Sequence, residues 1–344
     1  VIKYLVEYFR GNAKQLAEDG YFTDFISNGV STELCFMAFC AFTLIIIFAG
    51  VQNGIERVSK IMMPILIVLS VIIAVYSVTR PGALAGVKYF LVPNVKNFSW
   101  MTVVSAMGQM FYSLSIAMGI LITFGSYMKK DTAIEDSTRN VEVFDTGIAI
   151  MAGLMIIPAV FAFSGGDPNT LQAGPSLMFI TIPKVFQNMG FGTVIGIVFF
   201  LLVLFAAVTS SIALTESAVS TFEDELGWGR KKATVLVGVI MLALGSLSSL
   251  GYGPLAGIKI IGMQFLDLFD FLTNSVMMPI AALLTSLLVS RVVGIDKIED
   301  EIIHGESAFR RKKVFVVMIK YLCPVFAIII LLSSVANALG WIKM

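Results

Sequence analysis

Eight long apolar runs constrain the fold of this chain more than any other feature of its sequence. An α-helix needs about 20 residues to cross a bilayer, and most of these runs are close to that length. Charged residues make up 14% of the 344 residues, whereas a soluble domain carries about 25%. The sequence therefore predicts an all-α integral membrane protein, with spans near 35–50, 61–78, 101–127, 143–163, 191–215, 233–250, 260–290 and 314–339.

Basic residues are unevenly divided between the loops. The segments 51–60, 128–140, 226–232 and 291–313 hold more than half of the 24 lysines and arginines. Because Lys and Arg accumulate on the cytoplasmic side, these loops should face the cytoplasm and the C-terminus should face outward. The outer segment 163–190 contains GPSLMFITIPKVF, which is amphipathic, too short to span, and suited to a cap or lid. We expect one transmembrane transporter domain over residues 1–344, in the cell inner (plasma) membrane.

The span 101–127 contains residues that weaken a helix. Gln109, Ser113 and Ser115 fall near its centre, with Gly108 and Gly119 on either side. Gly lowers helix stability by about 1 kcal/mol relative to Ala, and Ser offers its neighbours alternative hydrogen bonds. A helix broken around residues 113–118 would expose backbone groups to cations and carboxylates. The alternative is that these small residues merely let helices pack closely.

Three adjacent hydroxyls interrupt another apolar run, AAVTSSIALTES at 206–217. Residues three apart on a helix share a face, so the Ala206 carbonyl should lie near the hydroxyls of Thr209 and Ser210. Such oxygens are the hard ligands that sodium prefers, and other helices would complete the shell. The alternative is that each hydroxyl bonds back to the carbonyl of residue i−4, as is common in membrane helices.

Acidic residues within apolar segments are candidates for function, because a carboxylate at mid-bilayer costs about 2.5–3.5 kcal/mol. Asp145 begins one apolar run, and Asp267 and Asp270 share a helix face in QFLDLFDFLTN. The alternative for the last two is an interfacial location with access to water. Glu216 and the acids at 223–226 lie near a cytoplasmic helix end, where we expect them to be solvated or paired.

Several stretches together resemble the neurotransmitter:sodium symporter family, also called the sodium- and chloride-dependent transporters. The register is that of the bacterial eleven-helix type. It implies an inverted five-plus-five helix repeat that lacks the first two helices and half of the third, since VIKYLVEYFRG resembles the outer half of the third helix. Alone, such an N-terminally truncated fragment is not expected to transport. The matching stretches are GVQNGIERVSKIMMPIL (50–66), GQMFYSLSIAMGILITFGSYMKK (108–130), GPSLMFITIPKVF (174–186), VTSSIALTESAVSTFEDEL (208–226) and DLFDFL (267–272).

The resemblance also implies roles for single residues. Asp270 matches the acid of the outer gate, and Gln109 matches a residue of the chloride site in chloride-dependent members. A fixed carboxylate at Asp145 near Ser113, as a direct ligand or a neighbouring charge, would offset the sodium charge without an anion. We therefore expect that chloride is not required. The implied sodium ligands are Ala206, Thr209 and Ser210 at one site and Ser113 at the other, where Asp145 departs from the family pattern and would join Ser113 at the sodium ion. The implied substrate pocket comprises Tyr112, Ser113, Ser115, Met118, Ser210 and Leu214.

The predicted function is import of an amino acid, a hydrophobic or aromatic L-amino acid, by sodium-coupled symport with alternating access. Its partners would be sodium ions at two sites, the amino acid and the lipid bilayer. No nucleic-acid partner and no covalent catalysis are expected, and the oligomeric state is left open. Two alternatives remain at this point: an intramembrane hydrolase using Asp267 and Asp270, and a membrane channel or regulatory fragment without transport.

Overall fold

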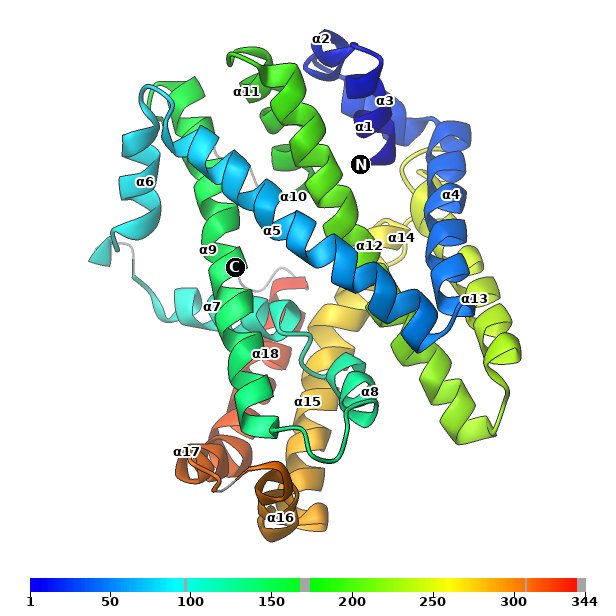
Figure 1. Ribbon diagram of the computed structural model, residues 1–344. Helices are drawn as coiled ribbons and strands as arrows, with labels where there is room; N and C mark the ends of the chain where they lie inside the picture. The colour runs from blue at the N-terminus through cyan, green and yellow to red at the C-terminus, as the bar shows by residue number, and fades with distance from the viewer. Residues whose placement is uncertain (96–97, 168–173, 307, 339–344) are drawn as a thin grey trace. The chain divides into compact units, whose positions relative to one another are not determined.

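The computed structural model describes residues 1–95, 98–167, 174–306 and 308–338. Within these residues the chain is helical, and the β-type pairing consists of a single bridge between Ile260 and Met263. Figure 1 shows the helices and their order. The described residues form two compact units, each built from two separate parts of the sequence: residues 1–94 with 147–259, and 95–146 with 260–344.

The first unit contains α12, the longest of the described helices, and the elements that pack around it. α12 contacts α1, α4, α5 and α13, and α5 runs across it (Figure 1). Helix α9 (Ile134–Ser164) begins in the second unit and ends in the first. The remaining elements are α1 Ile2–Phe9, α2 Ala13–Leu16, α3 Tyr21–Ser27, α4 Gly29–Phe48, η1 Val51–Glu56, α5 Arg57–Val78, α6 Ala83–Leu91, α10 Gly174–Ser176, η4 Leu177–Thr181, α11 Ile182–Gln187, α12 Gly192–Leu226 and α13 Arg230–Leu250.

Aromatic side chains of the first unit form a core where α1 meets α12. Tyr4 and Tyr8 are buried and lie against Phe200, and Phe179 stacks on the same ring. Gly196 allows this approach, because a Cβ at that position would lie 2.3 Å from the Tyr8 ring. Tyr4 also donates a hydrogen bond to the Phe179 carbonyl (2.8 Å). These contacts fix the outer segment that follows α10 against the transmembrane helices.

The second unit is built around α15 and α18, which pack together, with the end of α7 against them. Phe111, Met278, Ala282, Ala327 and Ile330 are buried at this junction. Its elements, besides the first turns of α9, are α7 Trp100–Ser113, α8 Ile120–Ser126, α14 Phe265–Asp270, η5 Phe271–Met277, α15 Met278–Leu287, η6 Leu288–Val293, α16 Ile295–Gly305, α17 Lys312–Val317, η7 Met318–Leu322 and α18 Cys323–Ala338.

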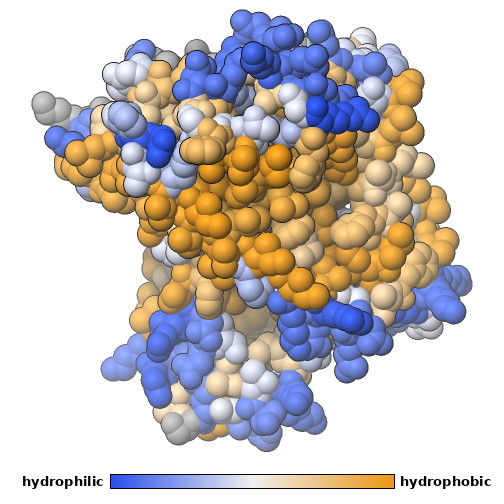
Figure 2. All heavy atoms as spheres, turned by 45° about the horizontal axis from the view of Figure 1, so that its top comes forward, coloured by the Kyte–Doolittle hydropathy of each residue, from blue (hydrophilic) through white to orange (hydrophobic). Residues whose placement is uncertain are grey.

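Seven helices among the described residues are long and apolar enough to cross a membrane. They correspond to seven of the eight predicted spans, and the eighth, 101–127, is divided between α7 and α8. Large apolar side chains are exposed on these helices, as on α5 at Ile61, Val68 and Val75. On the face shown in Figure 2, hydrophobic side chains cover a broad continuous area, and hydrophilic ones gather in separate areas outside it. Such a surface suits contact with lipid.

The amphipathic segment predicted at 174–186 forms the short elements α10, η4 and α11, which together are too short to span a membrane, as expected. Ile182, Val185 and Phe186 are buried, and α11 packs on α12 and α2. Lys184 forms an ion pair of 2.5 Å with Asp19, which joins this segment to the preceding outer loop. The role of the segment as a cap or lid stays a prediction, and residues 168–173 of the predicted outer loop lie outside the described part of the chain.

Candidate functional site: a broken helix and a half-buried carboxylate

The helix predicted to be broken around residues 113–118 is broken there. α7 ends at Ser113 and α8 begins at Ile120. Ser115, Ala117 and Gly119 have φ values of 55°, 64° and 79°, in the left-handed region that costs a non-glycine residue roughly 1–2 kcal/mol. Close packing of small residues is therefore not the only effect of this sequence. The turn ends the helical hydrogen-bond ladder within an otherwise apolar span.

Asp145 lies against the end of α7. The Ser113 hydroxyl donates a hydrogen bond of 2.7 Å to Oδ1 of Asp145 on α9. Asp145 is half-buried, and a carboxylate inside a membrane span is stable only with a polar partner. The contact places a fixed negative charge beside a hydroxyl at the helix break. This is the arrangement of oxygens that could hold a monovalent cation.

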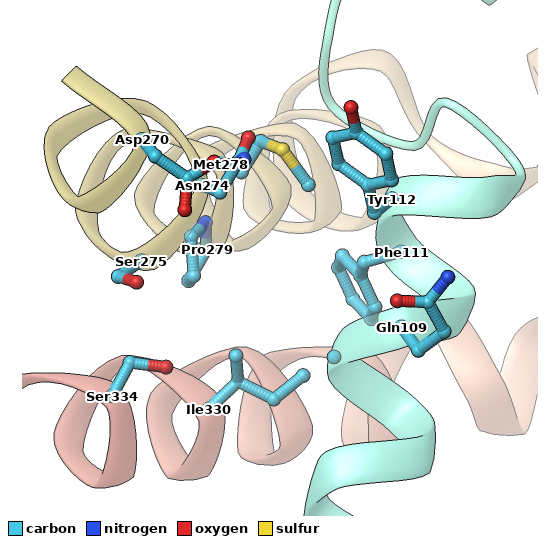
Figure 3. A pocket seen from close by; sticks show the side chains of 11 residues that line it. Gln109, Phe111, Tyr112, Asp270, Asn274, Ser275, Met278, Pro279, Ile330 and Ser334 are labelled. Atoms are coloured by element: carbon cyan, nitrogen blue, oxygen red, sulfur yellow. Dashed lines mark hydrogen bonds between the residues drawn. The ribbon is translucent and has the colours of Figure 1, made fainter. Parts of the chain in front are cut away.

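A cavity of about 320 Å³ opens beside the last turns of α7. Gln109 and Tyr112 line it from α7, and Asp270 and Asn274 line it from the opposite helix (Figure 3). Asn274 donates a hydrogen bond of 2.6 Å to Asp270. The structure thus brings Gln109, Tyr112 and Asp270 to one cavity, while Asp267 is exposed and is not among the residues that line it.

A second, more apolar cavity of about 390 Å³ lies at the break itself and is lined by residues of α7, the turn and α8. Ser115 lines it together with Ala117 and Gly119 of the turn. Met118 packs against the buried residues between α15 and α18. The residues predicted for one substrate pocket therefore face different parts of the second unit, Tyr112 toward the first cavity and Ser115 toward the second.

The three adjacent hydroxyls of α12, at residues 209–211, differ in their contacts and exposure. The Thr209 hydroxyl donates to the carbonyls of Phe205 (3.1 Å) and Ala206 (3.0 Å). Each interpretation of Thr209 therefore has a matching contact. The bond to Phe205 is the back-bond to residue i−4, and the contact with Ala206 brings together two of the oxygens expected at a sodium site. Ser210 is exposed on the first unit. Ser211 lies 3.1 Å from the Thr43 hydroxyl of α4.

The contact of Ser211 with Thr43 was missed by the sequence reasoning. The signal that could have found it is Thr43 itself, a lone hydroxyl with zero exposure in the apolar middle of α4. Leu214, one turn beyond Ser210, is half exposed on the same unit. The grouping of Ser210 and Leu214 in a substrate pocket stays a prediction.

Glu216, in the last third of α12, is paired, as expected. Its carboxylate has zero exposure and accepts bonds of 2.9 Å and 2.6 Å from the two Nη atoms of Arg230. Arg230 also donates to the carbonyl of Ile47 at the end of α4 (3.0 Å). Because a buried charge is tolerated only when it is paired, this network joins three helix ends.

Comparison with known proteins places these features in a family. The model of the Sodium:neurotransmitter symporter family matches residues 2–341. Two curated bacterial relatives are each described as an uncharacterized sodium-dependent transporter. YhdH of Bacillus subtilis is 33% identical over 97% of this chain and 74% of its own length. The protein of Haemophilus influenzae is 30% identical over 97% and 74%.

A solved structure is similar as well. The crystal structure of MhsT in complex with L-phenylalanine superposes with a TM-score of 0.84 at 33% identity, over 97% of this chain and 75% of that one. The all-α, inverted-repeat transporter fold predicted from the sequence is therefore confirmed. The intramembrane hydrolase alternative is wrong, because the family comprises transporters. The chain belongs to the sodium:neurotransmitter symporter family, and it is a multi-pass, sodium-dependent transporter of the cell inner (plasma) membrane.

Proposed function

We propose that this transporter imports a hydrophobic or aromatic L-amino acid by symport with sodium. The observation that carries the proposal is the helix break at Ser113, where a hydroxyl meets the carboxylate of Asp145. Free backbone groups at such a break suit the carboxylate of an amino acid and a cation. MhsT, solved with L-phenylalanine, supports an aromatic substrate, as do the apolar side chains of Tyr112, Met118 and Leu214 in the proposed pocket with Ser113, Ser115 and Ser210.

One sodium site uses Ser113 and Asp145. The carboxylate supplies the negative charge that offsets the cation, since an opposite charge nearby stabilises each ionised partner. Because this charge is part of the chain, a chloride ion is not needed beside Gln109, which lies one helical turn before Ser113. Transport is therefore independent of chloride.

A second sodium site uses the Ala206 carbonyl with the hydroxyls of Thr209 and Ser210. The Thr209 oxygen already lies 3.0 Å from the Ala206 oxygen. On binding, the Thr209 hydroxyl turns its proton away from that carbonyl, so that both oxygens face the ion. Asp270, hydrogen-bonded to Asn274, serves as the acid of the outer gate in an alternating-access cycle.

The test is binding of a radiolabelled amino-acid panel to the purified intact protein, with sodium replaced by potassium at constant ionic strength. The account expects saturable binding of apolar L-amino acids in sodium alone. Ser210→Ala should raise the half-saturating sodium concentration by about tenfold, because it removes a hydroxyl contact to a charged group. Ser211→Ala is the matched control, since its hydroxyl contacts Thr43 instead.

Equal binding in sodium and potassium would overturn the proposal. If Ser210→Ala and Ser211→Ala changed the half-saturating sodium concentration equally, both hydroxyls would serve helix packing rather than sodium binding. A steady ionic current without saturable binding would favour the channel alternative.

A further inference from the structure

The first turn of α9 is capped by a carboxylate from a distant segment of the same unit. Oε1 of Glu306 accepts hydrogen bonds from the backbone N–H groups of Glu135 (2.6 Å) and Asp136 (3.4 Å). The first N–H groups of a helix have no partner within it. A carboxylate there satisfies them and is also favoured by the helix dipole. Glu306 thus fixes where α9 begins.

The contact is reciprocal. Glu135 accepts a hydrogen bond from the backbone N–H of Arg310 (2.9 Å). Arg311 donates to Glu142 (2.9 Å), and its Nε lies 3.8 Å from Glu135. We call these five residues the inner clamp: Glu135, Glu142, Glu306, Arg310 and Arg311.

The two backbones also touch beside the clamp. A Cβ at Gly305 would lie 2.6 Å from the carbonyl oxygen of Thr132. The last residue of α16 therefore lies against the segment just before α9, without room for a side chain. Neither backbone can therefore move closer to the other without a clash.

The clamp residues of α9 share a face with Asp145. Glu135 and Glu142 are seven residues apart and Asp145 follows three later, which places all three along one side of the helix. At 1.5 Å per residue, the stripe is about 15 Å long. One end of it contacts the loop after α16, and the other end contacts Ser113.

We propose that the inner clamp positions Asp145 for the sodium site, by fixing the height and rotation of α9 so that its carboxylate meets Ser113. This inference rests on the proposed role of Asp145. Glu306 and Arg311 are positioning residues and touch neither sodium nor substrate. The Arg311–Glu142 pair is half exposed, and such pairs contribute little to folding. Loss of the Arg311–Glu142 pair should therefore lower the sodium affinity and leave the stability of the fold nearly unchanged.

The test measures sodium-dependent amino-acid binding by the intact protein with three single variants. Glu306→Ala removes the cap and should raise the half-saturating sodium concentration by about tenfold, as is typical when an outer partner of an ion ligand is lost. Glu306→Gln keeps an acceptor oxygen and should recover part of the affinity. Glu301→Gln is the matched control, since Glu301 is an exposed acid of α16 and should bind sodium like the wild type.

A double variant separates this inference from the proposed function. If Glu306 acts through Asp145, Glu306→Ala should add nothing to the sodium defect of Asp145→Asn. Additive defects would overturn the inference, as would a defect of Glu306→Ala that Glu301→Gln reproduces. If Asp145→Asn alone leaves sodium dependence unchanged, the proposed role of Asp145 fails instead.

Discussion

The hydroxyl of Ser113 donates a hydrogen bond of 2.7 Å to the carboxylate of Asp145. This contact joins the end of α7, where the helix breaks, to the fourth turn of α9. It gives the transporter a negative charge of its own beside the break. The proposed binding of sodium without chloride depends on that negative charge.

Asp145→Asn should make transport depend on chloride. The amide keeps a hydrogen-bonding side chain near Ser113 but removes the charge that offsets sodium, so that an anion from solution must replace it. Uptake by the variant should fall when chloride is replaced by gluconate, whereas wild-type uptake should not. Asp267→Asn, which removes an exposed acid, is the control. Full activity of Asp145→Asn in gluconate would show that the carboxylate is not the counter-charge.

Substitutions at Ala117 should separate backbone strain from side-chain size. Ala117 has a φ of 64°, so Ala117→Gly should relieve roughly 1 kcal/mol of strain and preserve sodium-dependent binding. A β-branched residue is a rare outlier at positive φ, and Ala117→Val should therefore weaken binding sharply. Ile116→Val, at a neighbour outside the positive-φ set, should be tolerated. If Ala117→Val bound substrate as well as Ala117→Gly, the left-handed turn would not be required.

The buried pair of Glu216 and Arg230 should show a non-additive effect on stability. Glu216 has zero exposure and Arg230 is 23% exposed at its side chain. Arg230→Met leaves a buried carboxylate without its main partner, which costs about 3–5 kcal/mol. The double variant Glu216→Gln/Arg230→Met should be more stable than Arg230→Met alone. Thermal unfolding in detergent measures both, and a double variant less stable than either single one would contradict this reasoning.

The sequence was most informative where the signal is local. Gly and Ser weaken a helix wherever they occur, and this is why the break after Ser113 could be predicted from 101–127 alone. The alignment with the family further predicted that Ser113 lies close to a carboxylate, that of Asp145. Periodicity could not show that Tyr112 and Ser115 face different cavities, because the left-handed residues of the turn redirect the side chains that follow.

Other contacts between distant segments were not predicted. Ser211 and Thr43 are 168 residues apart, and Glu306 caps α9 through the N–H of Glu135, 171 residues earlier. Such pairs leave no periodic pattern in the sequence. They arise from tertiary packing, which decides which of several similar hydroxyls or carboxylates finds a partner.

The outer segment should loosen in acid. The Lys184 ammonium beside Asp19 lowers the pKa of that carboxyl below its ordinary value, which is about 3.9 in an unfolded chain. The pair therefore contributes fully above that pH, and its contribution is lost as the pH falls through the lowered pKa. Hydrogen exchange of α11, corrected for intrinsic rates, should speed up in that range. In Asp19→Asn it should be faster already at neutral pH and insensitive to acid; a variant that retains the wild-type pH response would contradict the assignment.

Sodium-coupled import of an amino acid can be measured as uptake driven by a sodium gradient. The intact protein in proteoliposomes would be given radiolabelled L-phenylalanine with an inward sodium gradient, in chloride and in gluconate, and with sodium equal on both sides. The account predicts accumulation above equilibrium with the gradient, the same in both anions, and none without it. Accumulation that ignores the sodium gradient, or that collapses in gluconate, would contradict it.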